Sequence, residues 1–133
     1  MPGRNLSALA GSGKKWQPIG VNSAAAVPLA GAAGSTQTIK VQPPKGFAGR
    51  KIIIPSSVGQ FFLVNFIKVA NQPQIASGDP IHALSFAETV KDNDLEMDRV
   101  SPNGPIEVNV TNLDGAAHFF YMTIFGDQDD SGN

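Results

Sequence analysis

The chain contains no cysteine, which excludes disulfide bonds, thiolate metal sites and cysteine nucleophiles. Histidine, tryptophan and tyrosine are also scarce, with two, one and one residues. No apolar run approaches the length of a membrane-spanning helix. Residues 1–16 lack the apolar core of a signal peptide. We therefore expect a protein that is made in a cytoplasm, is not secreted by a signal peptide and has no transmembrane segment.

Acidic residues are absent from the first part of the chain. Residues 1–78 carry eight basic and no acidic side chains, whereas residues 79–133 carry all eleven acids and only Lys91 and Arg99 as bases. Such asymmetry bears on partners and self-association rather than on fold. It predicts charge complementarity, either within one domain whose strands interleave or between neighbouring subunits.

The chain is rich in turn-forming residues, with fourteen glycines and ten prolines among 133 positions. Its apolar segments are short, and the densest, residues 51–71, is dominated by β-branched and aromatic residues, which favour strands. Residues 61–69 are apolar at both parities, which predicts a central strand covered on both sides.

Turn signals separate several further strand-like segments. Strands are predicted at residues 36–41, 51–54, 61–70, 90–100, 106–111 and 117–125, with a helical turn or irregular crossover at 81–87 and a hairpin connection at 112–115. This pattern predicts an all-β, single-domain antiparallel β-sandwich. We expect a jelly roll, with an immunoglobulin-like sandwich as the alternative.

The two ends of the chain differ in composition from the middle. Residues 1–35 are rich in alanine, glycine and serine without a sustained period, which is typical of a segment that does not order on its own. They are predicted to form an extended arm, held by a neighbouring subunit through Arg4, Lys14, Lys15 and Trp16. Residues 36–126 then form the β-sandwich, and residues 127–133 an acidic C-terminal tail.

No motif brings a nucleophile, a base and an orienting acid together. His82 and His118 are therefore predicted to be structural. A glycosidase pair would have to come from Glu88, Glu96 and Glu107, which fall in segments predicted to be a loop, a strand edge and an outward strand face. The sequence thus predicts a protein that is not an enzyme, with no catalytic residue and no small-molecule substrate.

Four carboxylates recur at every second position, at Asp92, Asp94, Glu96 and Asp98. On a strand this spacing places them on one face. The pattern indicates a solvated edge that discourages unwanted strand pairing. The alternatives are contact with a basic partner surface and a Ca²⁺ site, although Met97 stands where an EF-hand needs glycine. We expect no dedicated metal.

The N-terminal region also bears on ligand binding. Ala8–Lys15 resembles a P-loop but lacks its first glycine and its Ser/Thr, so no nucleotide cofactor is expected. Arg4, Lys14, Lys15 and Trp16 could contact phosphates and stack on bases. Three cations spread over sixteen positions are sparse for that purpose. Nucleic acid is therefore not expected as the main partner.

Several segments together resemble the small single jelly-roll coat and minor capsid proteins of bacteriophages. They are the Ala/Gly-rich arm and residues 69–74 (VANQPQ), 77–81 (SGDPI) and 110–119 (VTNLDGAAHF). The resemblance extends over residues 36–126. It implies a self-assembling structural protein of a virion, made in the host cytoplasm, whose partners are copies of itself and other virion proteins.

Under this resemblance the subunits are expected to be held by the arm and by charge-complementary contacts, and no residue is catalytic. A carbohydrate- or ligand-binding β-sandwich module is the alternative. That function needs exposed aromatic side chains on a concave face.

Overall fold

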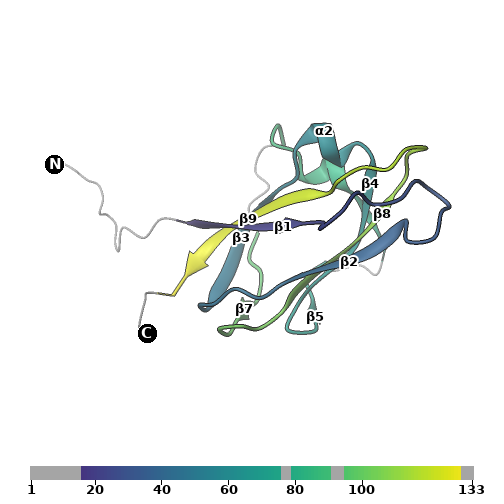
Figure 1. Ribbon diagram of the computed structural model, residues 1–133. Helices are drawn as coiled ribbons and strands as arrows, with labels where there is room; N and C mark the ends of the chain where they lie inside the picture. Colours follow the sequence, from purple (N-terminus) through teal and green to yellow (C-terminus); the bar gives the residue numbers. More distant parts are fainter. Residues whose placement is uncertain (1–15, 76–78, 91–94, 130–133) are drawn as a thin grey trace.

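The computed structural model describes residues 16–75, 79–90 and 95–129 (Figure 1). The strands are β1 (Gln17–Asn22), β2 (Thr36–Val41), β3 (Phe47–Ile53), β4 (Phe62–Val69), β5 (Gln72–Pro73), β6 (Ile81–His82), β7 (Arg99–Val100), β8 (Ile106–Asn112) and β9 (Tyr121–Gln128). A short helix, α2 (Ser56–Gly59), precedes β4, and a 3₁₀ helix, η1 (Ala83–Phe86), follows β6.

The strands form two antiparallel sheets that face each other. The first sheet has the order β1-β9-β3-β7. The second has the order β2-β8-β4-β5, with β6 also paired to β4. The predicted all-β antiparallel sandwich is therefore confirmed, and Figure 1 shows the two layers with α2 at one end.

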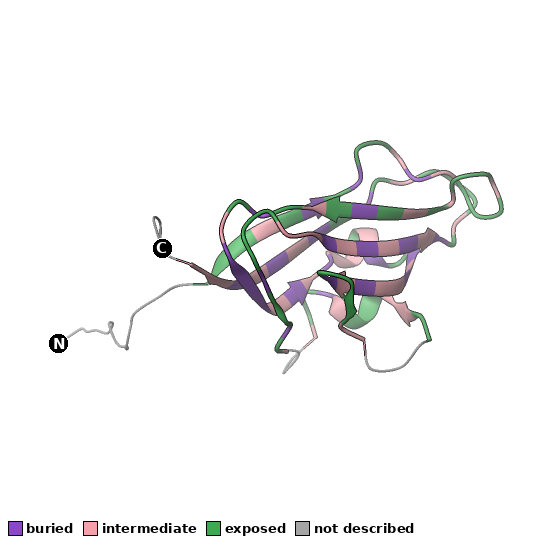
Figure 2. Cartoon of the chain, turned by 90° about the horizontal axis from the view of Figure 1, so that it is seen from below, coloured by how far each residue is buried: buried purple, intermediate pink, exposed green. Residues whose placement is uncertain are grey.

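The core lies between the sheets, and alternate residues of the longer strands fill it (Figure 2). Strand β8 shows this most clearly, because Ile106, Val108 and Val110 are buried as predicted while the residues between them are half-buried. From the first sheet, Met122 and Ile124 of β9 pack into the same core. Burying each such side chain contributes roughly 1.5–3 kcal/mol.

The boundary predicted at residue 36 is wrong, because residues 17–35 are part of the sandwich. Strand β1 pairs along its length with β9, from Gln17 opposite Gly126 to Asn22 opposite Tyr121. Val21 and Val27 are completely buried. The low-complexity composition concealed a strand whose partner lies about a hundred positions further along the chain. Of the predicted arm, residues 1–15 lie outside the described residues.

The prediction that 61–69 is covered on both sides is also corrected. A β-bulge between Val64 and Phe66 shifts the alternation, so that Phe62, Val64, Ile67 and Val69 all face inward. The opposite side of β4 is half-buried. A bulge inserts one residue and reverses the phase beyond it, which a strict period of two does not detect.

Three predicted boundaries near the C-terminal end differ from the structure. Residues 95–98 are not a strand, and only Arg99–Val100 forms β7. The predicted hairpin at 112–115 is absent, since β8 and β9 belong to different sheets. Strand β9 begins at Tyr121 and continues to Gln128, so the first residues of the predicted acidic tail belong to the sheet. There Gly126 packs so closely on Ala48 that a Cβ atom would lie 2.1 Å from its carbonyl oxygen.

Candidate interaction face

The outer face of the first sheet carries several apolar side chains that are exposed or half-buried. Because Met122 and Ile124 point into the core, Tyr121, Thr123 and Phe125 of β9 point outward. The register places Pro18 and Lys51 on either side of Phe125. We call this outer surface the aromatic face; its members are Pro18, Asn22, Lys51, Ile53, Phe119, Tyr121, Thr123 and Phe125.

Two aromatic side chains dominate the aromatic face. Phe119 and Tyr121 are each 45% exposed. Their rings lie 6.0 Å apart between centroids and are nearly parallel, with an interplanar angle of 9°. Large exposed apolar side chains that gather on one surface typically mark a contact with another molecule. The stacking also holds both rings in place, so less side-chain entropy is lost when a partner binds.

The outer face of the second sheet carries mainly polar side chains, although Leu63 and Phe66 of β4 are half-buried on it and Lys68 Nζ lies 4.6 Å from the centroid of the Phe66 ring. Asn65 Nδ2 donates to Asn109 Oδ1 at 2.7 Å and to Thr111 Oγ1 at 2.8 Å. Asn109 Nδ2 donates to Thr38 Oγ1 at 2.9 Å, and the hydroxyls of Thr36 and Thr111 are 2.8 Å apart. Cross-strand polar pairs of this kind suit a solvated face.

Arg50 lies on the bulge of β3 beside the aromatic face and connects two acidic segments. Its Nε donates to Asp127 Oδ2 at 2.8 Å, and its Nη1 donates to Glu96 Oε2 at 3.0 Å. The hydrogen bond to Asp127 is the main cause that raises the pKa of Arg50 above its ordinary value. Arg99 pairs similarly with Asp129. Two of these three ion pairs, Arg50–Asp127 and Arg50–Glu96, join a base from the basic part of the sequence to an acid from the acidic part. They are examples of the predicted charge complementarity within one domain.

Trp16 is the described member of the predicted assembly residues. It is 41% exposed and lines a shallow depression together with Arg50, Leu95 and Glu96. Arg4, Lys14 and Lys15 lie outside the described residues.

The predicted row of carboxylates is only partly described, since Asp92 and Asp94 lie outside the described residues. Glu96 pairs with Arg50, whereas Asp98 accepts from Gln74 Nε2 at 3.0 Å and its own N–H donates to Gln74 Oε1 at 2.8 Å. Within residues 16–75, 79–90 and 95–129, no group of three side chains is placed to hold a metal ion.

The two histidines have separate structural contacts. His118 stacks on Phe61 with 3.7 Å between ring centroids, and its Nε2 lies 2.7 Å from Asp114 Oδ2. The hydrogen bond to His118 lowers the pKa of Asp114. His82 Nδ1 accepts from the N–H of Leu84 at 3.2 Å, capping η1. No contact joins the two rings in the described part of the chain.

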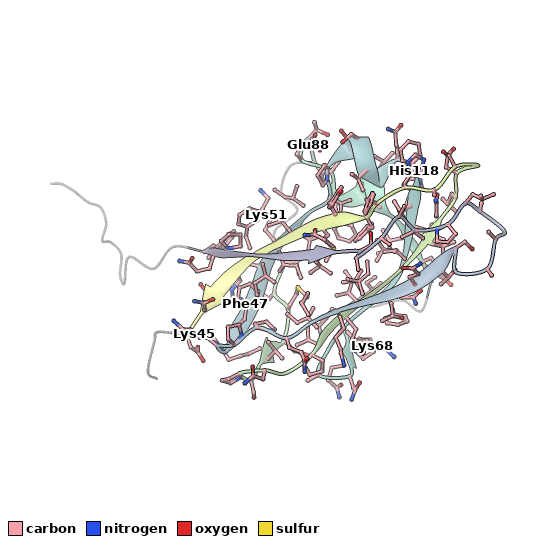
Figure 3. The ribbon with its side chains drawn as sticks, in the orientation of Figure 1. Lys45, Phe47, Lys51, Lys68, Glu88 and His118 are labelled. Carbon is pink, nitrogen blue, oxygen red and sulfur yellow. The ribbon has the colours of Figure 1, made fainter. Side chains whose placement is uncertain are left out.

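The three glutamates considered as a glycosidase pair have different partners on different elements. Glu88 accepts from the N–H of Ser56 at 2.8 Å and from its hydroxyl at 3.1 Å. Glu96 pairs with Arg50, and Glu107 lies on β8 opposite Lys40 and Lys68 of the adjacent strands. Glu88 and His118 lie toward the end of the molecule that carries α2, while Lys68 lies away from it (Figure 3).

Asn112 is a structural residue that the sequence reasoning missed. Its side chain is completely buried, and Nδ2 lies 3.1 Å from the carbonyl oxygens of Val27 and Pro28 and 2.9 Å from that of Ala116. Its Oδ1 accepts from the N–H of Asp114 at 2.9 Å. An Asn-x-Asp-Gly segment predicts a local turn, and no feature of it indicates bonds to a segment about 85 positions earlier.

An apolar cavity of about 250 Å³ lies between the sheets beside β3 and β4. Ile52 and Ile67 contribute to it from the two sheets, and Ile75, Phe86 and Leu95 line it as well. Gln74 and Glu96 are its polar members, and neither has a nucleophile beside it among the described lining residues. The cavity therefore provides apolar volume without a catalytic arrangement.

No helix in the described ranges is long and apolar enough to cross a membrane. Comparison with protein-family models, curated proteins and solved structures gave no match for this chain. The function must therefore be argued from the two outer faces and from the strand order.

Proposed function

We propose that this protein is a self-assembling structural subunit whose copies contact one another through the aromatic face, as in a virion shell. The observation that carries the proposal is the contrast between the two outer faces. One is mainly a network of hydrogen-bonded threonine and asparagine side chains, in which the apolar Leu63 and Phe66 are half-buried, whereas the other exposes stacked Phe119 and Tyr121. A monomer with both outer faces in water would have no need for one polar face and one face with exposed aromatic rings.

The strand order supports a jelly roll as the architecture of this subunit. Four antiparallel pairs are nested like the two arms of one long hairpin: β1 with β9, β2 with β8, β3 with β7 and β4 with β5. Folding such a hairpin over itself brings β9 beside β3 and β8 beside β4, as observed. Jelly rolls serve both viral capsids and lectins, so this architecture alone does not select between them.

The absence of a catalytic arrangement among the described residues is consistent with a structural role but does not carry it. The intersubunit arm was predicted over residues 1–35, and its role for residues 1–15 remains a prediction, as do the charge-complementary contacts between subunits. Arg50 already uses its charge within the chain.

Light scattering on the purified protein tests the proposal, because particles much larger than one chain are expected. Tyr121→Glu places a charge on the aromatic face and should shift the particles toward monomers. Leu84→Glu is the matched control, since Leu84 is 41% exposed but lies on η1, outside the aromatic face. Circular dichroism verifies that both variants are folded. A wild-type protein that stays monomeric at all concentrations refutes the proposal.

A carbohydrate-binding module is the second candidate. It is favoured by the exposure of Trp16 and Tyr121, the only tryptophan and the only tyrosine of the chain. This function predicts a monomer that binds glycans and loses that binding in Tyr121→Ala. A glycan array on the wild-type protein, read beside the light-scattering result, separates the two functions.

A further inference from the structure

We infer that strand β1 pairs with β1 of a second copy, antiparallel about a two-fold axis at Gly20, so that the first sheets of two copies become one continuous sheet. This inference rests on the proposed self-assembly and names one of its contacts. It concerns the open edge of the first sheet rather than the aromatic face.

The strand edges of the described sandwich differ in how open they are. The edges at β7, β5 and β6 are only two residues long. Strand β2 is six residues long but carries Lys40, and lysine on an edge strand opposes pairing with another sheet. Strand β1 is also six residues long, has no charged residue, and within the described ranges has no strand on its other side. Its one protecting feature is Pro18, which removes a single donor, so most of this edge remains open to another strand.

The backbone of β1 presents a defined set of groups on its free side. The N–H of Ser23 donates to the carbonyl of Phe120. Backbone direction alternates along a strand, so Val21 and Ile19, two and four positions before Ser23, also point their amides toward β9. Pro18, Gly20 and Asn22 consequently direct their backbone groups away from β9. Pro18 has no N–H, so this edge offers its carbonyl but no donor at that position.

A second copy of β1 matches this set of groups. With Gly20 opposite Gly20 of the second copy, the two glycines exchange N–H···O bonds, and each Asn22 N–H meets a Pro18 carbonyl of the other copy. Because Pro18 has no N–H, the carbonyl of the opposite Asn22 is the one group left without a partner in the other copy, and water can reach it. Because facing residues then share parity, the aromatic faces of both copies lie on the same side of the joined sheet.

The identity of the pair also favours a second copy over an unrelated strand. A two-fold axis places each residue opposite its own symmetry mate or a near neighbour, and like charges directly opposite would destabilise the pair. The sequence of β1, QPIGVN, contains none. Gly20 has no side chain at the axis, so the two backbones approach without steric conflict.

Cysteine cross-linking tests this geometry, because the chain has no cysteine of its own. Gly20→Cys should give a disulfide-linked dimer as the main product of mild oxidation, since paired Cα atoms about 5.5 Å apart are within disulfide range. Thr38→Cys is the control: it is exposed near the middle of β2, on the outer face of the second sheet, away from both β1 and the aromatic face. It should remain largely monomeric on a reducing-agent-free gel.

A mixture of Pro18→Cys and Asn22→Cys proteins checks the register, and should cross-link more than either variant alone. If the wild-type protein assembles but neither Gly20→Cys nor the mixture cross-links more than Thr38→Cys, the β1 pairing is wrong and the proposed function stands. If the wild-type protein is monomeric and no variant cross-links, both are wrong. Circular dichroism on each variant ensures that a negative result comes from folded protein.

Discussion

The side-chain amide of Asn112 lies 3.1 Å from the carbonyl oxygen of Val27, and this bond joins the beginning of the sandwich to its end. Val27 is completely buried and forms an isolated β-bridge with His118. The segment after β1 is therefore fastened to the connection between β8 and β9. Burial makes each of these polar groups costly to leave without a partner.

Replacing Asn112 with alanine should lower the free energy of unfolding by about 3 kcal/mol, because its completely buried side-chain amide bonds the carbonyl groups of Val27, Pro28 and Ala116 at once. Urea denaturation measures the loss. Asn109→Ala in the same strand is the control, and it should cost less than about 1 kcal/mol because water can replace its half-exposed partners. Equal midpoints for the two variants would contradict the role assigned to Asn112.

Strand β1 is expected to be required for folding. Val21→Ala should reduce the free energy of unfolding by roughly 2–3 kcal/mol through loss of buried methyl groups and the cavity left behind. Asn22→Ala, at the adjacent exposed position, should change it by less than about 0.5 kcal/mol. Deleting residues 1–35 removes both Val21 and Val27 and should abolish the cooperative urea transition. A truncated protein that still unfolds cooperatively would show that β1 is dispensable.

Acid should weaken the contact between Glu88 and α2. The backbone N–H groups of Glu88 itself and of Ser56 lower the pKa of the Glu88 carboxyl. A lowered pKa in the folded state means that the stabilisation is present above the unfolded value of about 4.3. It is lost as the pH falls through the lowered folded value.

The stability difference between the wild type and Glu88→Gln should therefore shrink as the pH falls below about 4. Urea midpoints across a pH series measure this difference. Ser56→Ala removes one donor and should reduce the same pH dependence in part. If the stability difference between the wild type and Glu88→Gln is the same at every pH, the ionised Glu88 carboxylate does not stabilise the folded state.

High salt separates apolar from charged contacts between subunits. If the aromatic face holds the assembly, particle size should be retained near 1 M sodium chloride, where the screening length falls to about 3 Å. Ammonium sulfate should strengthen it, because excluded salts favour apolar burial. Sedimentation across both series provides the measurement. Dissociation in sodium chloride would instead support the charge-complementary contacts predicted from the division of basic and acidic residues.

The sequence predicted the sandwich because strands such as β8 carry a clear signal. Ile106, Val108 and Val110 alternate with polar residues over an uninterrupted ladder. Strand β4 was placed correctly but its phase was not, because the bulge at Asn65 depends on the register with β8. Strand β1 was missed because only Ile19 and Val21 face inward, and its partner β9 is remote in sequence.

The aromatic face was less accessible to prediction than the fold. Residues 117–125 are largely apolar at both parities, which signals that the outer side also needs cover. Which parity is exposed depends on the pairing of β9 with β1 and β3. The stacking of Phe119 on Tyr121 and the bonds of Asn112 to Val27 are consequences of tertiary structure, and no local pattern encodes them.

The position of β9 between β1 and β3 has a consequence for biosynthesis. Strands β1 and β3 leave the ribosome long before their shared neighbour is translated, since translation adds only about 5–20 residues per second. The surface that exposes Tyr121 and Phe125 does not exist until β9 has emerged and inserted between them. Nascent chains crowded on one polysome therefore have no such surface to present to each other, and under the proposed self-assembly any contact through it would wait until each sandwich is complete.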